Sequence, residues 1–557
     1  MQNSFVELNG RERARALLDE GTFRELLGPL DKIQSPHLEP QGIVPQSDDG
    51  IILAFGEIRK QKVLIISMEG AFQGGGIGEV SGAKISGALE LALEANKSGN
   101  KLYPIMIFDT GGVRLQEANY GLLSISEIAT QIVGLRKYVP VIGLIPGRVG
   151  AFGGMSITAE LFTTLLATKK ARLGLNGPEV IEQEAGVMEF DSSDKALIWN
   201  TIGANQRFHT GLIDEVVEDT TDAIIEAIDN ALKAPAKPAR TEQIDFYLTL
   251  LSDLDPTEFW TPERYREFYK QIQPVQQPVP LAREGTSDAS DSRGYYWFSH
   301  LTGINHPISD VPSVLAADVE KNGQLCRYIA IVPDTSNRFP RVRNGEVGMR
   351  EAWTVAQIVR DAIRQDEDQA TKRPIIVVID VPSQAYGYKE ELVGISLALA
   401  ASADAYATAR LEGHPVIGVI VGNAISGGFL AHGLQSNRLI ALDDSKVNIQ
   451  AMSKASAARI TKRTIAELDE ATKKVPAMAY DVRSYSTLGA LYSLLSGIQA
   501  DDPQNSDVAI VEWTISEAIE STKGAPRDLS FRLQTKEALA GGRTATNNVR
   551  QALLEQW

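Results

Sequence analysis

The sequence predicts an α/β protein made of two similar halves, each with a buried sheet between layers of helices. Short apolar runs alternate with longer segments of helix-forming composition along the chain, which is typical of α/β layering. Three landmarks of the first half return in order in the second: Pro140-Val-Ile-Gly143 as Pro415-Val-Ile-Gly418, Gly153-Gly154 as Gly427-Gly428, and Asp109 as Asp380. The offsets are 275, 274 and 271 residues. Spacing this constant indicates an internal duplication.

The apolar runs are short, rich in β-branched residues and bounded by turn residues, so we expect them to be strands. They are residues 63–67, 104–108 and 141–145 in the first half, and 328–332, 375–379 and 416–421 in the second. Residues 82–95 and 352–366 are expected to be helices. Strand, helix and strand in both halves predict sheets covered on both faces.

Length, charge and composition limit the class of protein. A chain of 557 residues exceeds one domain, so two or more are expected. The net charge of −16 argues against a nucleic-acid-binding surface. No apolar run reaches the roughly 18–20 residues of a membrane helix, and no secretion signal is evident, so we expect a cytoplasmic protein. The single cysteine, Cys326, rules out an intramolecular disulfide and a Cys-rich zinc site.

The middle of the chain is its most polar part. Residues 233–240 and 273–292 are rich in Pro, Gln, Ser and charged residues, and such segments bury too little apolar area to order themselves. We therefore predict a polar linker over about residues 233–292. The first domain is predicted to span residues 1–283 and the second residues 284–557.

The first glycine-rich turn, residues 72–79, lies between an expected strand and an expected helix. Gly75 and Gly76 are expected to let a ligand approach main-chain N–H groups, because they carry no Cβ. A nucleotide-binding loop is the alternative. The spacing of Gly76, Gly78 and Gly82 matches neither G-x-G-x-x-G nor a Walker loop, so we disfavour it.

The second turn, residues 147–155, carries a glycine pair where a buried strand runs into a helix-like segment. The N–H groups of Gly153 and Gly154, like those of Gly427 and Gly428 in the second half, can point at one developing oxyanion. The simpler interpretation is that these glycines only permit a tight crossing from strand to helix. Their duplication at matched positions favours the anion-binding interpretation.

The third turn, residues 109–117, follows a strand, which is where open α/β sheets usually bind ligands. Gly111 and Gly112 are expected to shape a loop along the binding site. Arg114 either meets a phosphate or carboxylate or forms a solvated pair with Glu117. The six histidines show no metal-ligand spacing, and no G-x-S-x-G elbow is present. Duplicated anion-binding turns without an evident triad suggest enolate chemistry.

At this point the motifs resemble a known family. Five segments of the first half resemble, in the same order, those of acyl-CoA carboxyltransferase β subunits: residues 11–26, 72–84, 109–117, 147–156 and 176–180. The second half resembles the γ subunit of malonate decarboxylase through residues 296–298, 343–348, 380–387, 422–433, 451–459 and 478–485. The first half correspondingly resembles the β subunit of that enzyme.

The resemblance implies two crotonase-like, carboxyltransferase-type domains in tandem, with the active site where they meet. It implies fused β and γ subunits of a biotin-independent malonate decarboxylase, in which a malonyl thioester loses CO₂ through an enolate and becomes an acetyl thioester. The malonyl group would ride on the phosphoribosyl-dephospho-CoA arm of a separate acyl carrier protein subunit. The acetyl-S-ACP:malonate ACP transferase (α) subunit is the other implied partner. The implied assembly is a cytoplasmic hetero-oligomer without biotin, metal, nucleic acid or membrane.

The resemblance also assigns roles to residues. The catalytic residues would be Gly153, Gly154, Gly427 and Gly428, with the first pair favoured for the thioester oxygen. The substrate-binding residues would be Gly75, Gly76, Gly111, Gly112, Arg114, Gln384, Ala385 and Ser426. Lys84 and Arg172 are candidates for the phosphates of the carrier arm.

Two alternatives stay open. One is a biotin-dependent acyl-CoA carboxyltransferase, and the other is a non-catalytic scaffold that docks a carrier protein. The chain has no Lys flanked by Met for biotin attachment and no four-Cys zinc ribbon. The matching turn of the second half has Ser426-Gly427-Gly428 where relatives often carry Gly-Gly-Ala, which leaves the geometry of that anion hole open. Intact glycine pairs in both halves oppose the scaffold.

Overall fold

The computed structural model describes residues 4–273, 291–304, 309 and 311–557 and contains two sheets. In the first sheet the strands are neighbours in sequence order: β1 (Arg24–Leu26), β2 (Ile51–Ile58), β3 (Gln61–Met68), β4 (Tyr103–Ile107), β5 (Ile142–Ile145), β6 (Thr164–Thr168) and β7 (Glu215–Val217). β1, β2 and β3 pair antiparallel, whereas β3 to β7 pair parallel.

The second sheet repeats this construction. Its order is β14 (Ser493–Leu495), β12 (Arg438–Leu442), β11 (Val416–Ile425), β10 (Ile375–Val381), β9 (Gln324–Ile331) and β8 (Val314–Lys321), and β13 (Ile449–Gln450) pairs with β11. Only β8 and β9 pair antiparallel. The predicted strands are all present, with ends shifted by a few residues. The prediction of an α/β fold with two duplicated halves, each built on its own sheet, is therefore confirmed.

Four long helices follow equivalent strands in the two halves: α2 (Glu79–Lys97) and α3 (Ala118–Leu135) in the first, α12 (Met349–Gln365) and α14 (Ile395–Leu411) in the second. The two predicted helices lie within α2 and, apart from one terminal residue, α12. The other α-helices are α1 (Gly10–Leu17), α4 (Gly154–Ala159), α5 (Pro178–Ala185), α6 (Lys195–Ile202), α7 (Ala204–His209), α8 (Thr221–Lys233), α9 (Ile244–Asp253), α10 (Pro262–Gln271), α11 (Arg293–Thr302), α13 (Tyr388–Val393), α15 (Ser426–Ala431), α16 (Lys454–Thr461), α17 (Ile465–Lys474), α18 (Val482–Ser486), α19 (Asn505–Glu520) and α20 (Thr544–Gln556).

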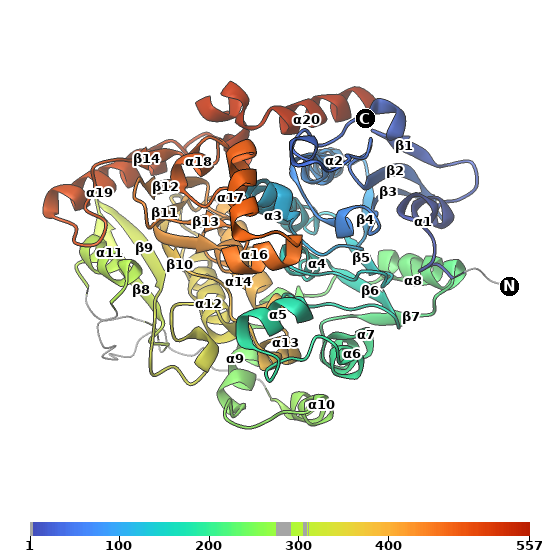
Figure 1. The fold of residues 1–557 in the computed structure, drawn as a ribbon, viewed down its shortest axis with the longest axis horizontal. Helices are drawn as coiled ribbons and strands as arrows, with labels where there is room; N and C mark the ends of the chain where they lie inside the picture. The colour runs from blue at the N-terminus through green and yellow to red at the C-terminus, as the bar shows by residue number, and fades with distance from the viewer. Residues whose placement is uncertain (1–3, 274–290, 305–308, 310) are drawn as a thin grey trace.

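The two sheets lie on opposite sides of the molecule, with α3 and α14 packed against each other between them (Figure 1). Every residue of α3 is buried, because one face of this helix packs on α2 and another meets the second half. The short helices α4 and α15 contact α3 and each other. The ends of β5 and β11, from which these short helices start, are therefore brought to the same junction.

Two helices cross from one half to the other: α9, which precedes the second half, packs on α12, and α20, at the end of the second half, packs on α2. The helix α9 lies within the predicted linker, yet it carries buried Tyr247, Leu250 and Leu251 and packs on α12. The rings of Tyr247 and Trp353 stack with centroids 4.7 Å apart. The apolar face of α9 explains why this stretch is ordered in spite of its polar neighbours. The predicted boundary at residues 283 and 284 lies outside the described residues.

At the other end of the chain, α20 returns to the first half and lies along α2 (Figure 1). The backbone N–H and the hydroxyl of Thr546 both donate to Glu79 at 3.0 Å. The backbone N–H of Leu27 donates to Gln556 at 2.9 Å. Because of these contacts, the two halves are interlocked rather than joined at one face. Among the described residues, no helix is both long and apolar enough to cross a membrane.

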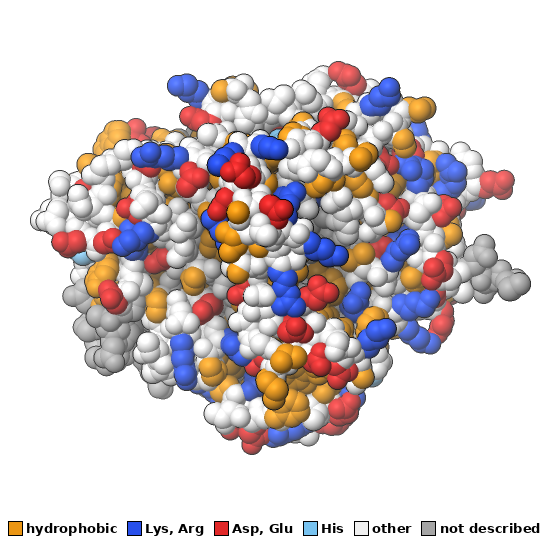
Figure 2. All heavy atoms as spheres, viewed as in Figure 1, with side chains coloured by type: hydrophobic (Ala, Val, Ile, Leu, Met, Phe, Trp, Pro, Cys, Tyr) orange, Lys and Arg blue, Asp and Glu red, His pale blue; other side chains and the backbone are white. Residues whose placement is uncertain are grey.

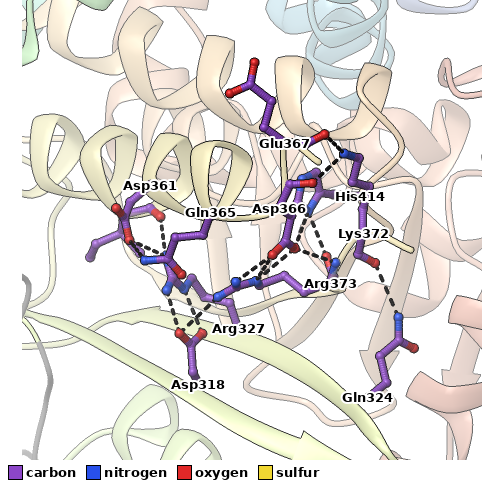
Figure 3. Close-up of polar contacts among 11 residues, drawn as sticks. Asp318, Gln324, Arg327, Asp361, Gln365, Asp366, Glu367, Lys372, Arg373 and His414 are labelled. Carbon is purple, nitrogen blue, oxygen red and sulfur yellow. Dashed lines mark hydrogen bonds and ion pairs between the residues drawn. The ribbon is translucent and has the colours of Figure 1, made fainter. Parts of the chain in front are cut away.

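A cluster of ion pairs stabilises the amino-terminal ends of β9 and β10 (Figure 3). Arg327 and Arg373 share Asp318, at 2.6 and 3.2 Å, and Arg373 also pairs with Asp366 at 2.6 Å. His414 lies beside them, with Nδ1 2.9 Å from the carbonyl oxygen of Arg373. Burial lowers the pKa of His414. This histidine is thus a packed, hydrogen-bonded residue at the amino-terminal ends of the strands, opposite the glycine turns at their carboxyl ends.

Asp404 on α14 forms a buried ion pair between the halves, and its contribution to stability can be measured. Its fully buried carboxylate lies 2.5 Å from Arg136 of the first half and 3.1 Å from Arg360. Burial by itself would raise the pKa of Asp404, but the two guanidinium groups outweigh burial and lower the pKa. We expect Asp404→Ala to cost about 3–5 kcal/mol of stability, because it leaves largely buried positive charge unpaired. The measurement is the midpoint of thermal unfolding.

Glu412, at the end of α14, provides the matched control. It pairs with Lys137 across the same junction, but both side chains are nearly half exposed. We expect Glu412→Ala to cost no more than about 1 kcal/mol, because solvent screens the pair. Equal losses in the two variants would contradict the role given to burial.

Candidate active site

A cavity of about 610 Å³ lies where the two halves meet. The first half lines it with residues from the turns after β3, β4 and β5 and from residues 172–180. The second half lines it with residues from the loop after β10, from the β11–α15 turn and from residues 451–461. Figure 2 shows the face that carries α5 and α16, where acidic and basic side chains are mixed. The carboxyl ends of both sheets thus border one space, which is where α/β sheets usually bind ligands.

The β5–α4 turn offers a free main-chain donor to this cavity. Gly153 has φ +57° and ψ −145°, a conformation that favours glycine. Its N–H donates to the carbonyl oxygen of Leu175 at 2.9 Å. Gly154, the first residue of α4, lines the cavity, and its N–H has no acceptor within the described part of the chain. Gly154 can therefore donate to a bound oxygen.

A buried ion pair holds this turn in place. Oδ1 of Asp109 accepts from the N–H of Val149 at 2.6 Å, and Oδ2 lies 2.7 Å from Arg13. In the second half, Asp380 accepts in the same way from the N–H of Asn423 at 2.9 Å. The matched aspartates predicted from the sequence are thus matched in function: both fix the turn between strand and helix.

The β11–α15 turn has the same shape but a different donor environment. Ser426 has φ +59°, so it corresponds to Gly153, and Gly427 corresponds to Gly154. The offset is therefore one residue less than the glycine pairs suggest. The N–H of Gly427 donates to Oε1 of Gln384 at 2.9 Å. The donor equivalent to that of Gly154 is occupied by a side chain of the protein.

Gly154 and Gly428, the second glycines of the two predicted pairs, also differ in whether they border the cavity. Gly154 lines the cavity, whereas Gly428 lies behind the wall. A Cβ at Gly428 would lie 2.5 Å from the carbonyl oxygen of Ser383, so glycine is needed there for close packing of the backbone. The structure thus gives Gly428 a packing role that accounts for its presence without substrate contact.

The loops after β3 and β4 shape the far wall. Gly76 and Gly111 line the cavity, but Gly75 and Gly112 do not. A Cβ at Gly75 would lie 1.9 Å from the carbonyl oxygen of Asp109, which explains its glycine. Gly112 has φ +102° and packs on the backbone of Phe152. These two glycines support the wall rather than contact a ligand.

The guanidinium group of Arg114 is held inside the wall. Nη1 lies 2.8 Å from both Asp49 and Glu117, and all three side chains are buried. Burial, together with the neighbouring Glu117, raises the pKa of Asp49 to about 6, against the opposing effect of Arg114. The predicted pair with Glu117 exists, but it is buried rather than solvated. Arg114 borders the cavity with its charge already neutralised.

The two phosphate candidates differ sharply. Arg172 lines the cavity and lies over the rings of Phe152 and Trp199, at 5.5 and 4.8 Å from their centroids. Its buried Nε has no hydrogen-bond partner among the described residues. Lys84 is fully buried, and Nζ donates to three carbonyl oxygens, at 2.5 to 3.0 Å. The predicted role of Lys84 as a phosphate ligand is wrong, because its donors are used in the core.

Sequence reasoning missed several residues that meet in the cavity. Asn176 and Tyr386 line it, and Glu391 of α13 binds the Asn176 loop from behind. Burial raises the pKa of Tyr386, whose hydroxyl interacts with the side chains of Ser426 and Gln384. Asn176 and Tyr386 stand inside motifs noted in the sequence, but no spacing rule singles them out. Ala385, predicted to bind substrate, contributes its carbonyl oxygen to Asn176 at 3.2 Å and does not line the cavity.

Comparison with known proteins identifies the family. A model described as "Malonate decarboxylase gamma subunit" matches residues 342–557, and one described as "Carboxyl transferase domain" matches residues 7–272. The Malonyl-S-ACP:biotin-protein carboxyltransferase MADC of Malonomonas rubra is 42% identical over 248 residues, which are 43% of this chain and 78% of that protein. The chain belongs to the malonate decarboxylase branch of the carboxyl transferases. Its two halves are a fused β-type and γ-type subunit of that family, as the motifs predict.

Two further proteins are similar to parts of this chain. The Malonyl-S-ACP:biotin-protein carboxyltransferase MADD of Malonomonas rubra is 33% identical over 191 residues, which are 34% of this chain and 65% of that protein. The Pseudomonas malonate decarboxylase hetero-tetramer, solved in complex with malonate, has a chain that is 51% identical. The match covers 48% of this chain and 98% of that chain, with a TM-score of 0.47.

The contrast between Arg172 and Lys84 is testable with a CoA thioester as the phosphate-bearing probe. We expect Arg172→Met to weaken binding roughly tenfold, because a charge-assisted contact is lost. We expect Lys84→Met to leave binding unchanged but to lower the thermal unfolding midpoint, because three buried carbonyl groups lose their donor. Calorimetric titration and thermal unfolding measure the two effects. Weaker binding of the CoA thioester by Lys84→Met, at normal stability, would show that Lys84 contacts the ligand after all.

Proposed function

We propose that this chain decarboxylates a malonyl group held as a thioester on an acyl carrier protein, giving the acetyl thioester and CO₂ without biotin. The observation that carries the proposal is the free N–H of Gly154 in a cavity that both halves line. Family membership supports a malonyl substrate, because two relatives are named for a malonyl-S-ACP substrate.

The chemistry requires a donor at one particular atom. When the bond between the carboxylate carbon and the α-carbon breaks, its electron pair forms the enolate and places negative charge on the thioester oxygen. A main-chain N–H aimed at that oxygen acts mainly in the transition state, because the charge is largest there. We assign this contact to Gly154, with Gly153 shaping the turn. The enolate then takes a proton at the α-carbon, which yields the acetyl thioester.

The cavity suits the acyl end of a pantetheine-like arm. Its volume lies in the range of roughly 300–1,000 Å³ typical of small-molecule sites. Arg172, with an unpartnered buried Nε, is the residue that would meet a phosphate of the phosphoribosyl-dephospho-CoA arm. We propose that a separate carrier protein presents this arm, and that a transferase (α) subunit completes a hetero-oligomer. A cytoplasmic location remains part of the proposal.

Biotin-dependent carboxyl transfer is the second candidate, and the names of two relatives favour it. MADC and MADD are both named malonyl-S-ACP:biotin-protein carboxyltransferases. The two candidates share the cleavage step and differ in where the carboxyl group goes. In the first it leaves as CO₂, and in the second it is passed to biotin.

The assay that separates the candidates uses the full chain and chemically prepared malonyl-CoA or malonyl carrier protein. We expect CO₂ release without added biotin and no inhibition by avidin, because the proposed reaction has no biotin step. Release that requires a biotin protein would establish the transferase. A chain inert toward both malonyl thioesters, with and without a biotin protein, would revive the scaffold alternative.

The role of Gly154 is testable with a variant that lacks its N–H. We expect Gly154→Pro to lower kcat roughly 10²- to 10³-fold relative to Gly154→Ala, because only proline lacks the donor. Proline is tolerated at the first position of a helix. Both variants place a Cβ near the side-chain ends of Leu430 and Ile125, at 2.7 and 2.9 Å, so they share this packing cost. Equal activity in the two variants, with similar thermal midpoints, would remove Gly154 from the mechanism.

A further inference from the structure

A buried carboxylate of the second half holds the first half's cavity loop. Glu391 on α13 is fully buried, and Oε1 accepts from the N–H of Asn176 at 2.7 Å and from Nδ2 of the same residue at 3.1 Å. Oε2 accepts from the N–H of Leu175 at 3.2 Å. Arg207 lies 3.5 Å away. Loop residues 175–176 are therefore fixed from across the junction.

This arrangement determines which way two amide side chains point. Nδ2 of Asn176 faces acceptors only, the Glu391 carboxylate and the carbonyl oxygen of Ala385. Oδ1 of Asn176 must therefore face Gln384, which presents Nε2 to it at 2.8 Å. Oε1 of Gln384 is left for the N–H of Gly427 at 2.9 Å. The chain of hydrogen bonds runs in one direction, because its starting point is a carboxylate that can only accept.

Two consequences follow for the cavity. Oε1 of Gln384 accepts the N–H of Gly427, which corresponds to the free N–H of Gly154. The β11–α15 turn therefore does not offer this N–H to a ligand. Nε2 of Gln384 carries two hydrogens: one is donated to Oδ1 of Asn176 at 2.8 Å, and the second lies on the side of the amide that the Tyr386 hydroxyl borders at the cavity. Gln384 lines the cavity. At the β11–α15 turn, the cavity thus meets the side-chain N–H of Gln384 in place of the backbone N–H of Gly427.

We propose that Gln384 donates this second N–H to the free carboxylate of the malonyl group, and that Asn176 and Glu391 are positioning residues for it. The proposal rests on the function proposed above and names the contact that selects a malonyl over an acetyl thioester. Gly427 also becomes a positioning residue, because its N–H holds Oε1 of Gln384.

A neutral donor suits a carboxylate that must leave. A guanidinium paired with the carboxylate would stabilise the ground state more than the transition state, in which the leaving group approaches neutral CO₂. A single amide N–H orients the carboxylate at little such cost. Arg114 does not compete for this role, because Asp49 and Glu117 hold its Nη1.

The test compares two ligands that differ in the anionic group. Sulfoacetyl-CoA carries a sulfonate in place of the carboxylate and cannot lose CO₂, whereas acetyl-CoA carries neither. For Gln384→Met, a variant of similar size without donors, we expect the dissociation constant of sulfoacetyl-CoA to rise roughly tenfold and that of acetyl-CoA to stay unchanged. Gln384→Glu should lose more affinity for sulfoacetyl-CoA than Gln384→Met does, because the new carboxylate repels the sulfonate. Calorimetric titration of the full chain measures each constant.

The positioning role is tested by a double-mutant cycle. Asn176→Ala should weaken the binding of sulfoacetyl-CoA but not that of acetyl-CoA. Combining it with Gln384→Met should cause little further loss of affinity, because both residues act through one contact. Additive losses, or equal weakening of both ligands, would overturn the relay. Unchanged sulfoacetyl-CoA binding in Gln384→Met would overturn the carboxylate contact. Should Asn176→Ala fail to fold, the two Gln384 variants decide the contact by themselves.

These binding measurements do not depend on turnover. If the wild-type chain binds sulfoacetyl-CoA through Gln384 but releases no CO₂ from malonyl-CoA, the proposed reaction fails and the recognition contact stands. If it decarboxylates malonyl-CoA while Gln384→Met binds both ligands normally, the reaction stands and the contact fails.

Discussion

The packing of α3 against α14 is the constraint on which the site depends. Parallel strands release their loops at their carboxyl ends, so each half alone supplies one wall of loops and turns. Bringing the two central helices together makes those walls face one another. Buried polar contacts help to set the register of this packing; for example, Nη2 of Arg410 on α14 donates to the hydroxyl of Thr130 on α3 at 2.9 Å. Purely apolar packing would specify the register less strictly.

Duplication gave the two turns one shape, and their surroundings gave them different chemistry. Both follow a strand, both contain a residue with positive φ, and both are held by an aspartate. In the first, the carbonyl oxygen of Leu175 takes the N–H of Gly153 and leaves that of Gly154 free. In the second, Gln384 takes the equivalent N–H. A site with one backbone donor and one side-chain donor can treat the two ends of a malonyl group differently.

The wall behind the cavity carries an unusual amount of buried charge. Asp49, Arg114 and Glu117 are packed together without solvent, and burial raises the pKa of Asp49. Such groups are costly to bury unless each is paired. Because Arg114 is neutralised there, the wall presents glycine backbone rather than free charge to a ligand. At this wall the arrangement favours recognition by hydrogen bonds over recognition by ion pairs, whereas Arg172 brings a charged group to another part of the cavity.

Much of the fold was determined by the sequence alone. Strand runs such as 375–379, the repeat that pairs Asp109 with Asp380, and the glycines at positive φ all depend on local backbone and periodic burial, which adjacent residues encode. The family resemblance carried by the motifs around Gly154 and Gly427 also predicted a site at the junction, where the cavity lies. What the sequence left open depended on partners far away in the chain: Lys84 is used by core carbonyl groups, and Gly427 by Gln384. Which donor is free is decided only when distant segments pack, because a hydrogen bond already made in the protein is not available to a ligand.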